Sequence, residues 1–159
     1  MRSFADVQEL LAAEGADLGA TPWREIDQER VDSFADTTDD HQWIHVDTER
    51  AAAGCAPVTA DAGLAAVARA HSADMRDRDF FDHVNPDGVD PFARAEAAGI
   101  QYARAENIAA GQPDAAAVMA DWMASPGHRK NILNCDLRTL GVGVATGAGG
   151  PWWTQLFGS

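Results

Sequence analysis

The chain has 159 residues and is 46% apolar, which is enough for one domain with a hydrophobic core. Its formal net charge is −13, and an acidic chain without a basic cluster is a poor candidate for binding nucleic acid or an anionic membrane. The apolar runs are short and rich in alanine, so we expect no membrane span. The first residues also lack the long apolar stretch of a signal peptide.

The acidity is densest in the first third of the chain, where residues 1–46 hold 11 acidic and 3 basic residues. Short helical and extended segments are predicted there. Ser3 can cap a first helix that ends at Gly15, and Pro22–Ile26 predicts an extended segment. Asp27 can cap a second helix, and Thr37–Asp40 predicts a polar loop.

A longer helix is predicted to begin at Thr59 or Ala60. Apolar residues and one histidine fall at helical spacing on its inward face: Leu64, Val67, Ala68, His71 and Met75. The Asn-Pro-Asp-Gly run at Asn85–Gly88 predicts a turn after this helix.

Three shorter helices are predicted from prolines near their starts. Asp90 can cap the first of them, with Pro91 at its first position. Pro113 predicts the start of the second. Ser125-Pro126 repeats the cap-and-proline start for the third, which bears His128.

The C-terminal part of the chain predicts strands. Leu140–Ala145 and Trp152–Phe157 read as two strands joined by the glycine-rich turn Gly147–Gly150, which indicates a hairpin. Further strands are expected near 80–84 and 100–103. Helices dominate the first part and strands the last, so the predicted fold class is α+β, with a sheet packed between helices.

The chain has two cysteines, Cys55 and Cys135. Their number alone is compatible with two buried thiols or with one disulfide. A bridge would close a loop of about 80 residues, which on the chain-entropy model is worth about 4 kcal/mol.

From Asp47–Pro57 to Gly158, some 110 residues resemble the CAP superfamily (cysteine-rich secretory proteins, antigen 5 and pathogenesis-related proteins) in its bacterial SCP-domain form. The resemblance rests on several motifs in one order: Ala70–Met75, Phe80–His83, Pro86–Gly88, Glu106–Ile108, Trp122, Ser125–Leu133, Gly141–Val144 and Trp153–Gln155.

This resemblance implies an α-β-α sandwich with a central cleft that holds two histidines and two glutamates, the histidines being the attributed metal ligands. By position, His83 and His128 match the histidines and Glu106 matches one glutamate. The other glutamate is expected near Ser125, where the chain has no carboxylate after Asp121. The tetrad is therefore incomplete, which weakens any acid–base mechanism that needs two carboxylates.

The residue chemistry leaves several roles open for this cleft. Two neutral imidazoles and a carboxylate can hold Zn²⁺ or another divalent cation with an open position, and a His–Glu pair can also orient a water. Alternatively, His128 hydrogen-bonds within its own loop and Glu106 ties backbone amides. His71 and Ser125 are assigned to the cleft lining, although the apolar surroundings of His71 favour a buried core histidine over a ligand.

The resemblance also favours the Cys55–Cys135 disulfide, since bacterial relatives place a pair at these positions. It implies an extracellular or cell-envelope protein that binds a small-molecule, lipid or protein ligand, without a required cofactor and without well-defined catalysis. The alternative to a ligand-binding protein is a purely structural scaffold tied by the disulfide. The ligand and the oligomeric state are not implied by the sequence.

Residues 1–54 resemble a different family, the MaoC-like (R)-specific enoyl-CoA hydratases of the hot-dog fold, through Trp23–Val31, Phe34–Asp36 and Asp39–Asp47. In that family an Asp and a His five residues apart activate water, and Asp40 and His45 match them. The resemblance stops after Gly54, before the long central helix and most of the sheet. We therefore divide the chain into an incomplete hot-dog fragment, 1–46, and a CAP domain, 47–159, with hydratase activity as the alternative function.

Overall fold

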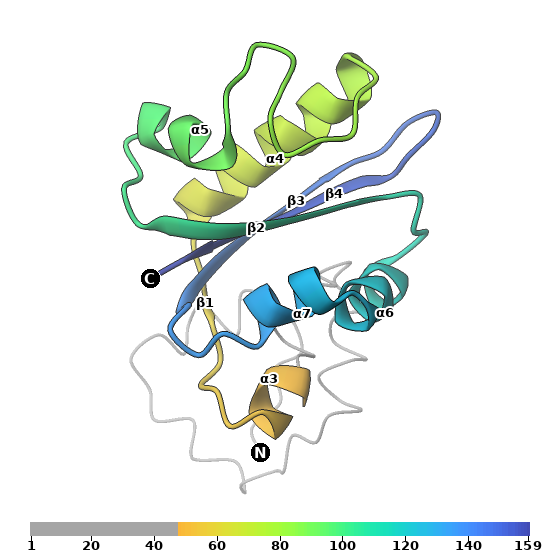
Figure 1. The fold of residues 1–159 in the computed structure, drawn as a ribbon. Coiled ribbons are helices and arrows are strands. Elements are labelled where there is room, and N and C mark those ends of the chain that lie inside the picture. The colour runs from red at the N-terminus through yellow and green to blue at the C-terminus, as the bar shows by residue number, and fades with distance from the viewer. Residues whose placement is uncertain (1–47) are drawn as a thin grey trace, which may run out of the picture.

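The computed structural model describes residues 48–159 (Figure 1). The segments predicted between Ser3 and Asp40, and the candidate dyad Asp40 and His45, lie outside the described residues. The helices are α3 (Thr48–Ala52), α4 (Ala62–Asp77), α5 (Pro91–Ala97), α6 (Ala115–Ala124) and α7 (Pro126–Ile132). The strands are β1 (Thr59–Ala60), β2 (Ala103–Ala110), β3 (Thr139–Ala145) and β4 (Trp152–Gly158).

The four strands form one sheet in the order β1-β3-β4-β2. The predicted hairpin of β3 and β4 is antiparallel, β2 pairs antiparallel with the other edge of β4, and β1 pairs parallel with β3. Helices α4 and α5 cover one face of the sheet, and α6 and α7 lie on the other side, with α3 beside α7 (Figure 1). The α+β class and the helix–sheet–helix sandwich are thus confirmed.

Two apolar clusters hold these layers together. On one face, α4 places Leu64, Val67 and Ala68 against Leu156 of β4. On the other, the buried side chains of α6 and α7 pack against the sheet as one cluster that includes Trp122, Ile132, Leu140 and Phe157. Strand β4 lies between the two clusters and is buried along its length, so it is the centre of the core.

Helix α4 approaches the sheet closely because β3 alternates glycine with valine. A Cβ atom built on Gly141 would lie 2.0 Å from the backbone nitrogen of Ala65, and one on Gly143 would lie 2.2 Å from the backbone of Ala68. No side chain fits at either position. The Gly-interrupted strand expected from the sequence is therefore a packing surface for a helix backbone.

The predicted start of α4 is two to three residues too early, since the helix begins at Ala62. Thr59 and Ala60 form β1, paired with Thr139 and Leu140, and do not open the helix. Asp61 caps α4, because its carboxylate accepts a hydrogen bond from the Leu64 backbone nitrogen at 2.8 Å. Likewise, α6 begins at Ala115 behind the cap Asp114, and not at Pro113.

The strand expected near 80–84 is also wrong, since residues 82–84 form bends and 80–81 have no regular structure. The Asp82 carboxylate accepts from the Val84 nitrogen at 2.9 Å, and the Asn85 side-chain oxygen accepts from the nitrogens of Asp87 and Val89. Side chains that bond the backbone locally compete with strand pairing. The strand expected near 100–103 begins at Ala103 and continues to Ala110.

Candidate functional site

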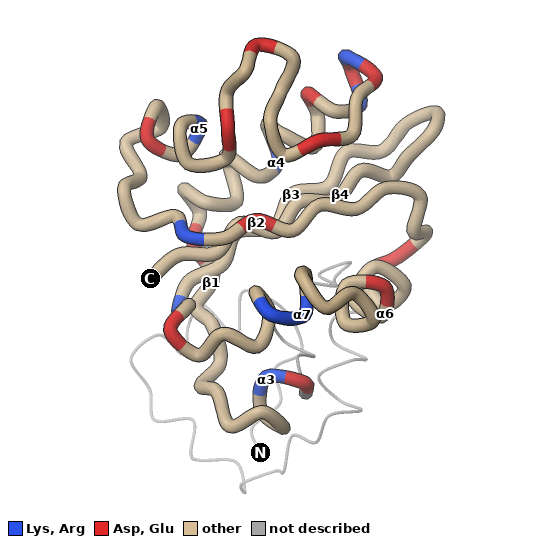
Figure 2. Tube along the Cα trace, viewed as in Figure 1, with Lys and Arg blue, Asp and Glu red and all other residues tan. Residues whose placement is uncertain are grey.

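The candidate site is built around a buried carboxylate on β2, an edge strand of the sheet. Glu106 is the one acidic residue of β2 (Figure 2), and its side chain is 2% exposed. The loop between α4 and α5 brings His83 to it, with 2.9 Å between His83 Nδ1 and Glu106 Oε1. The His83 side chain is 45% exposed, so one edge of the imidazole faces solvent while the other is held by the carboxylate.

Arg94, on α5, occupies the other oxygen of the same carboxylate. Its Nη2 donates to Glu106 Oε2 at 2.8 Å, and its Nη1 donates to the backbone oxygens of His83 at 2.7 Å and Val89 at 3.0 Å. One guanidinium therefore fixes both the carboxylate and the loop that presents His83. It also balances the charge of Glu106, which makes a buried carboxylate tolerable.

His71, on α4, lies behind this group and is 1% exposed. Its Nε2 is 3.1 Å from the backbone oxygen of Asp82 and 3.9 Å from Glu106 Oε1. Both neighbours are acceptors, so Nε2 holds the ring proton. Burial lowers the pKa of His71, which keeps the imidazole neutral despite the nearby Glu106 charge.

His128, on α7, is half-buried. Burial lowers its pKa, and the His83 charge lowers it further, so the two imidazoles interact electrostatically across the site. Its ring makes no hydrogen bond to another residue in the described range 48–159. The two histidines thus come from opposite layers of the sandwich and are close enough for their charges to interact.

A buried amide network next to these histidines joins α7 to the sheet. Asn107 donates through Nδ2 to the backbone oxygen of His128 at 3.3 Å and to Gln155 Oε1 at 3.1 Å. Asn131 donates to Asn107 Oδ1 at 2.9 Å and to the Glu106 backbone oxygen at 3.4 Å. Since Asn107 and Gln155 are fully buried, these bonds tie α7 firmly to β2 and β4.

The structure provides no carboxylate at the expected position of the second glutamate. Asp121 accepts a hydrogen bond from Gln112 at 2.9 Å on the exposed side of α6. Ser125 is half-buried at the start of α7 and makes no side-chain bond to the helix backbone. The partner of Glu106 is instead the cation Arg94.

A divalent cation at this site would have to be held by the imidazoles of His83 and His128. Among residues 48–159, no three His, Cys, Asp or Glu side chains are grouped closely enough to form a ligand set. Both oxygens of Glu106 are engaged, so this residue fits as the partner that orients His83 and leaves Nε2 for the ion. Metal-ligating histidines usually have such a carboxylate on their other ring nitrogen.

Two residues at the centre of the site were not predicted from the sequence. Arg94 falls one position before the buried Ala95 on α5, and helical spacing from Pro91 places it near the inward face. This helical spacing is the sequence signal from which the inward position of Arg94 could have been predicted. For Asn107 the sequence offers only its place beside Glu106, because its partners Asn131 and Gln155 are distant in the chain.

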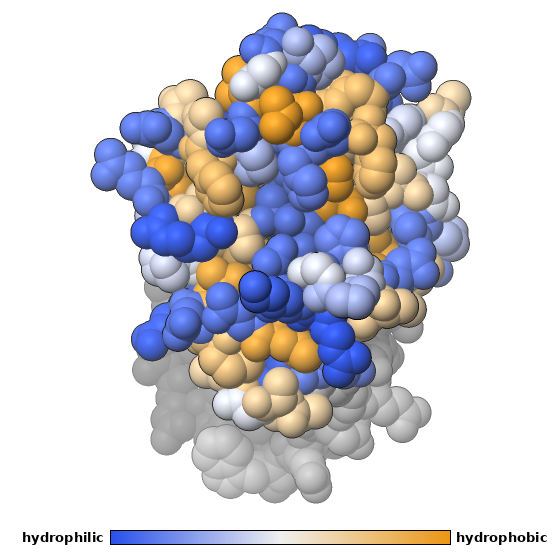
Figure 3. All heavy atoms as spheres, viewed as in Figure 1, coloured by the Kyte–Doolittle hydropathy of each residue, from blue (hydrophilic) through white to orange (hydrophobic). Residues whose placement is uncertain are grey.

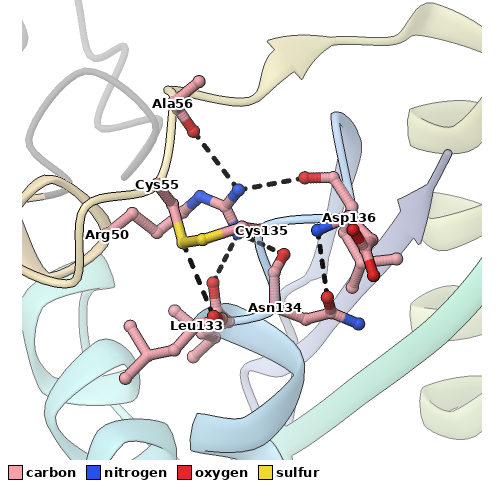
Figure 4. The surroundings of a disulfide bond; sticks show 9 residues. Arg50, Cys55, Ala56, Leu133, Asn134, Cys135 and Asp136 are labelled. Carbon is pink, nitrogen blue, oxygen red and sulfur yellow. Dashed lines mark hydrogen bonds between the residues drawn. A yellow bond between two sulfur atoms is a disulfide. The ribbon is translucent and has the colours of Figure 1, made fainter.

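The predicted disulfide is confirmed. Cys55 and Cys135 are bonded, with their Cα atoms 4.9 Å apart and 80 residues between them in sequence (Figure 4). The bond joins the segment after α3 to the turn after α7. The space-filling view shows polar side chains across the middle of the face that bears β2, flanked by apolar patches (Figure 3).

A three-layer sandwich with histidines on both sides of a buried glutamate defines a CAP-type domain, and the comparisons agree. The model of the cysteine-rich secretory protein family matches residues 43–157, so the chain belongs to this family. The Bacillus subtilis protein YkwD is 44% identical over 110 residues, which cover 69% of this chain and 42% of YkwD.

A solved structure leads to the same fold. The crystal structure of an extracellular protein with an SCP domain from Bacillus anthracis aligns with a TM-score of 0.68 and 29% identity, over 86% of this chain and 45% of that one. The chain therefore spans less than half the length of both relatives. No helix in the described part of the chain is long and apolar enough to cross a membrane.

The resemblance of the N-terminal part is confirmed separately. The 3-hydroxyacyl-thioester dehydratase Z of Mycobacterium tuberculosis is 59% identical over 54 residues, which make up 34% of this chain and 36% of that enzyme. The remaining two thirds of the dehydratase have no counterpart in this match.

Proposed function

We propose that residues 47–159 form an extracellular binding module whose cleft takes its ligand between His83 and His128, without catalysis. The observation that supports this most strongly is the fixed geometry of His83. Glu106 Oε1 lies 2.9 Å from its Nδ1, and the side chain is 45% exposed, which leaves Nε2 for a ligand. A bound Zn²⁺ or other divalent cation would supply a Lewis-acidic centre that a small-molecule, lipid or protein ligand can contact.

Within residues 48–159, no second carboxylate lies near Glu106, which argues for binding over acid–base chemistry. Both oxygens of Glu106 are already engaged, one by Arg94 and the other by His83, so neither is free to face a substrate. The low pKa of His128 keeps its imidazole neutral at neutral pH, which is the form that ligates metals. The extracellular location is proposed from the family and from the Bacillus anthracis relative.

Calorimetric titration of the intact chain with Zn²⁺ tests this proposal. We expect saturable binding that is lost in His83→Ala and in His128→Ala. His41→Ala/His45→Ala is the matched control, because it removes the two histidines that lie outside residues 48–159 and tests whether they bind the ion instead. Retention of full affinity in both His83→Ala and His128→Ala would refute the cleft as the zinc site.

The match to the dehydratase supports one alternative, a hydration of enoyl thioesters through Asp40 and His45. The chain matches only 36% of that enzyme, so we propose this activity second. Hydration of an enoyl-CoA by the intact chain, compared with Asp40→Asn, decides it. Turnover that requires Asp40 would establish the alternative, and the absence of such turnover would eliminate it.

A further inference from the structure

The element that holds the end of α7 is a buried arginine next to the disulfide (Figure 4). Arg50, on α3, is 2% exposed, and its guanidinium donates to four backbone oxygens. The acceptors are Ile132 at 2.5 Å, Leu137 at 2.9 Å, Asn134 at 3.2 Å and Ala56 at 3.3 Å. We call Arg50 and the Cys55–Cys135 disulfide together the α3 clamp.

The chemistry of the α3 clamp matches the end of a helix. The last carbonyls of a helix have no partner within it and form the negative end of its dipole. A guanidinium presents several N–H groups in a rigid fork and satisfies several such oxygens at once. Arg50 therefore binds the C-terminal end of α7 and the turn after it, and Cys135 in this turn is covalently tied to Cys55.

The rest of α7 is held by the amide bonds of Asn107 with His128 and Asn131, but its first turn has no side-chain cap. The helix has seven residues, and its N-cap Ser125 makes no side-chain hydrogen bond to the helix backbone. A helix this short depends on its tertiary contacts. His128 lies one turn before Ile132, whose backbone oxygen Arg50 binds. A shift at the clamped end is thus transmitted to the imidazole within one turn.

We propose that the α3 clamp is the positioning element for His128, so that reduction of the Cys55–Cys135 disulfide by a dithiol weakens ligand binding in the cleft. The second clause rests on the proposed function. A thiolate of the dithiol attacks Sγ of Cys135, which is the exposed residue of the pair, and Cys55 leaves as a thiolate. The second thiol then displaces Cys135, which leaves two cysteine thiols and an oxidised dithiol.

Hydrogen–deuterium exchange tests the positioning claim without any ligand. We compare the parent with Cys55→Ser/Cys135→Ser and with Arg50→Met. The amides of α7 are expected to exchange about tenfold faster in both variants, while those of α4 and β4 stay protected. Unchanged exchange in α7 would overturn the proposal. If the cysteine variant does not fold, the parent is measured before and after dithiothreitol, and Arg50→Met stands as the second test.

Zinc titration tests the effect on the cleft and uses the serine variant, because free thiols and dithiothreitol bind zinc themselves. We expect the dissociation constant for Zn²⁺ to rise about tenfold relative to the parent. Faster exchange in α7 with unchanged zinc affinity would overturn the coupling to the cleft. A parent that binds no zinc would refute the proposed function, and the exchange measurement would still decide whether the clamp positions α7.

Two controls separate a local effect from general destabilisation. Leu64→Ala removes a fully buried side chain from the α4 face and should speed exchange in all elements alike. Arg78→Met removes an arginine that pairs with Asp74 on α4 and Asp87 in the following loop, and α7 should keep its parental exchange rate.

Discussion

At the scale of single residues, the site depends on a carboxylate whose two oxygens have different partners. His83 takes one oxygen and Arg94 takes the other. The sequence allowed His83, Glu106 and His128 to be selected as candidates, because their motifs follow one another in a recognisable order. Arg94 and Asn107 could not be selected, since their roles come from contacts with residues that are far apart in the chain.

Glu106→Gln tests whether the carboxylate orients His83. The amide keeps the size of the side chain but loses the charge that holds the imidazole and balances Arg94. We expect zinc affinity to fall about 10- to 100-fold, as for other partners of ligating histidines. Calorimetry measures this effect, with Glu96→Gln on the exposed side of α5 as control. Equal affinities of Glu106→Gln and the parent would contradict the orienting role.

The buried His71 predicts how stability depends on pH. Burial lowers its folded-state pKa below that of the unfolded chain, so the unfolded state binds protons more readily. The stability linked to this group is present above pH about 6.5 and is lost as the pH falls through the folded-state pKa. His128 acts in the same direction.

Urea unfolding between pH 5.5 and 7.5 checks this expectation. The free energy of unfolding should decrease as the pH is lowered, and His71→Gln should make the decrease shallower. A parent whose stability is flat over this range, or a His71→Gln variant with the parental slope, would show that the buried histidine does not titrate as described.

At the scale of elements, local sequence signals worked where a helix begins at a cap. Asp90 directly precedes Pro91 and is the N-cap of α5, as the sequence indicates. Its carboxylate accepts hydrogen bonds from the backbone nitrogens of Phe92 and Ala93. These signals failed to predict the structure around Asp82, because side chains there bond to nearby backbone groups and so prevent strand pairing. They also failed for β1, whose two residues are a strand only because Thr139 and Leu140 pair with them.

Gly141→Ala tests the close contact between β3 and α4. The new methyl group would lie 2.0 Å from the Ala65 nitrogen, so the helix and the strand must separate. We expect a loss of about 3 kcal/mol or more in the free energy of unfolding.

Gly127→Ala is the matched control in α7, where no atom lies within 4 Å of the added carbon. Its stability should stay equal or rise by up to about 1 kcal/mol. Chemical denaturation measures both variants, and equal losses would contradict the packing argument.

At the scale of the whole molecule, the sequence predicted the sandwich and the disulfide through the family resemblance. It did not predict the α3 clamp. Arg50 follows an acidic helix start and looks like a solvated residue in the sequence, but three of its four acceptors lie 82 to 87 residues later in the chain. Such long-range contacts cannot be read from a local pattern.

Removal of the disulfide tests how much the stability of the domain depends on this covalent link between distant parts of the chain. On the chain-entropy model, Cys55→Ser/Cys135→Ser should lower the free energy of unfolding by about 4 kcal/mol. That is a large part of the stability of an ordinary domain. Urea denaturation of the variant and the parent measures the difference. A loss below about 1 kcal/mol would mean that the other contacts of α3 hold the end of α7 by themselves.

The central claim is that His83, oriented by Glu106, and His128 face one ligand. Crystals of the intact chain grown with Zn²⁺ and measured at the zinc absorption edge test it most directly. We predict an anomalous difference peak about 2.1 Å from Nε2 of His83 and from a ring nitrogen of His128, with Glu106 still on Nδ1 of His83. A cleft without a peak at saturating zinc, or a peak that contacts neither imidazole, would contradict the account.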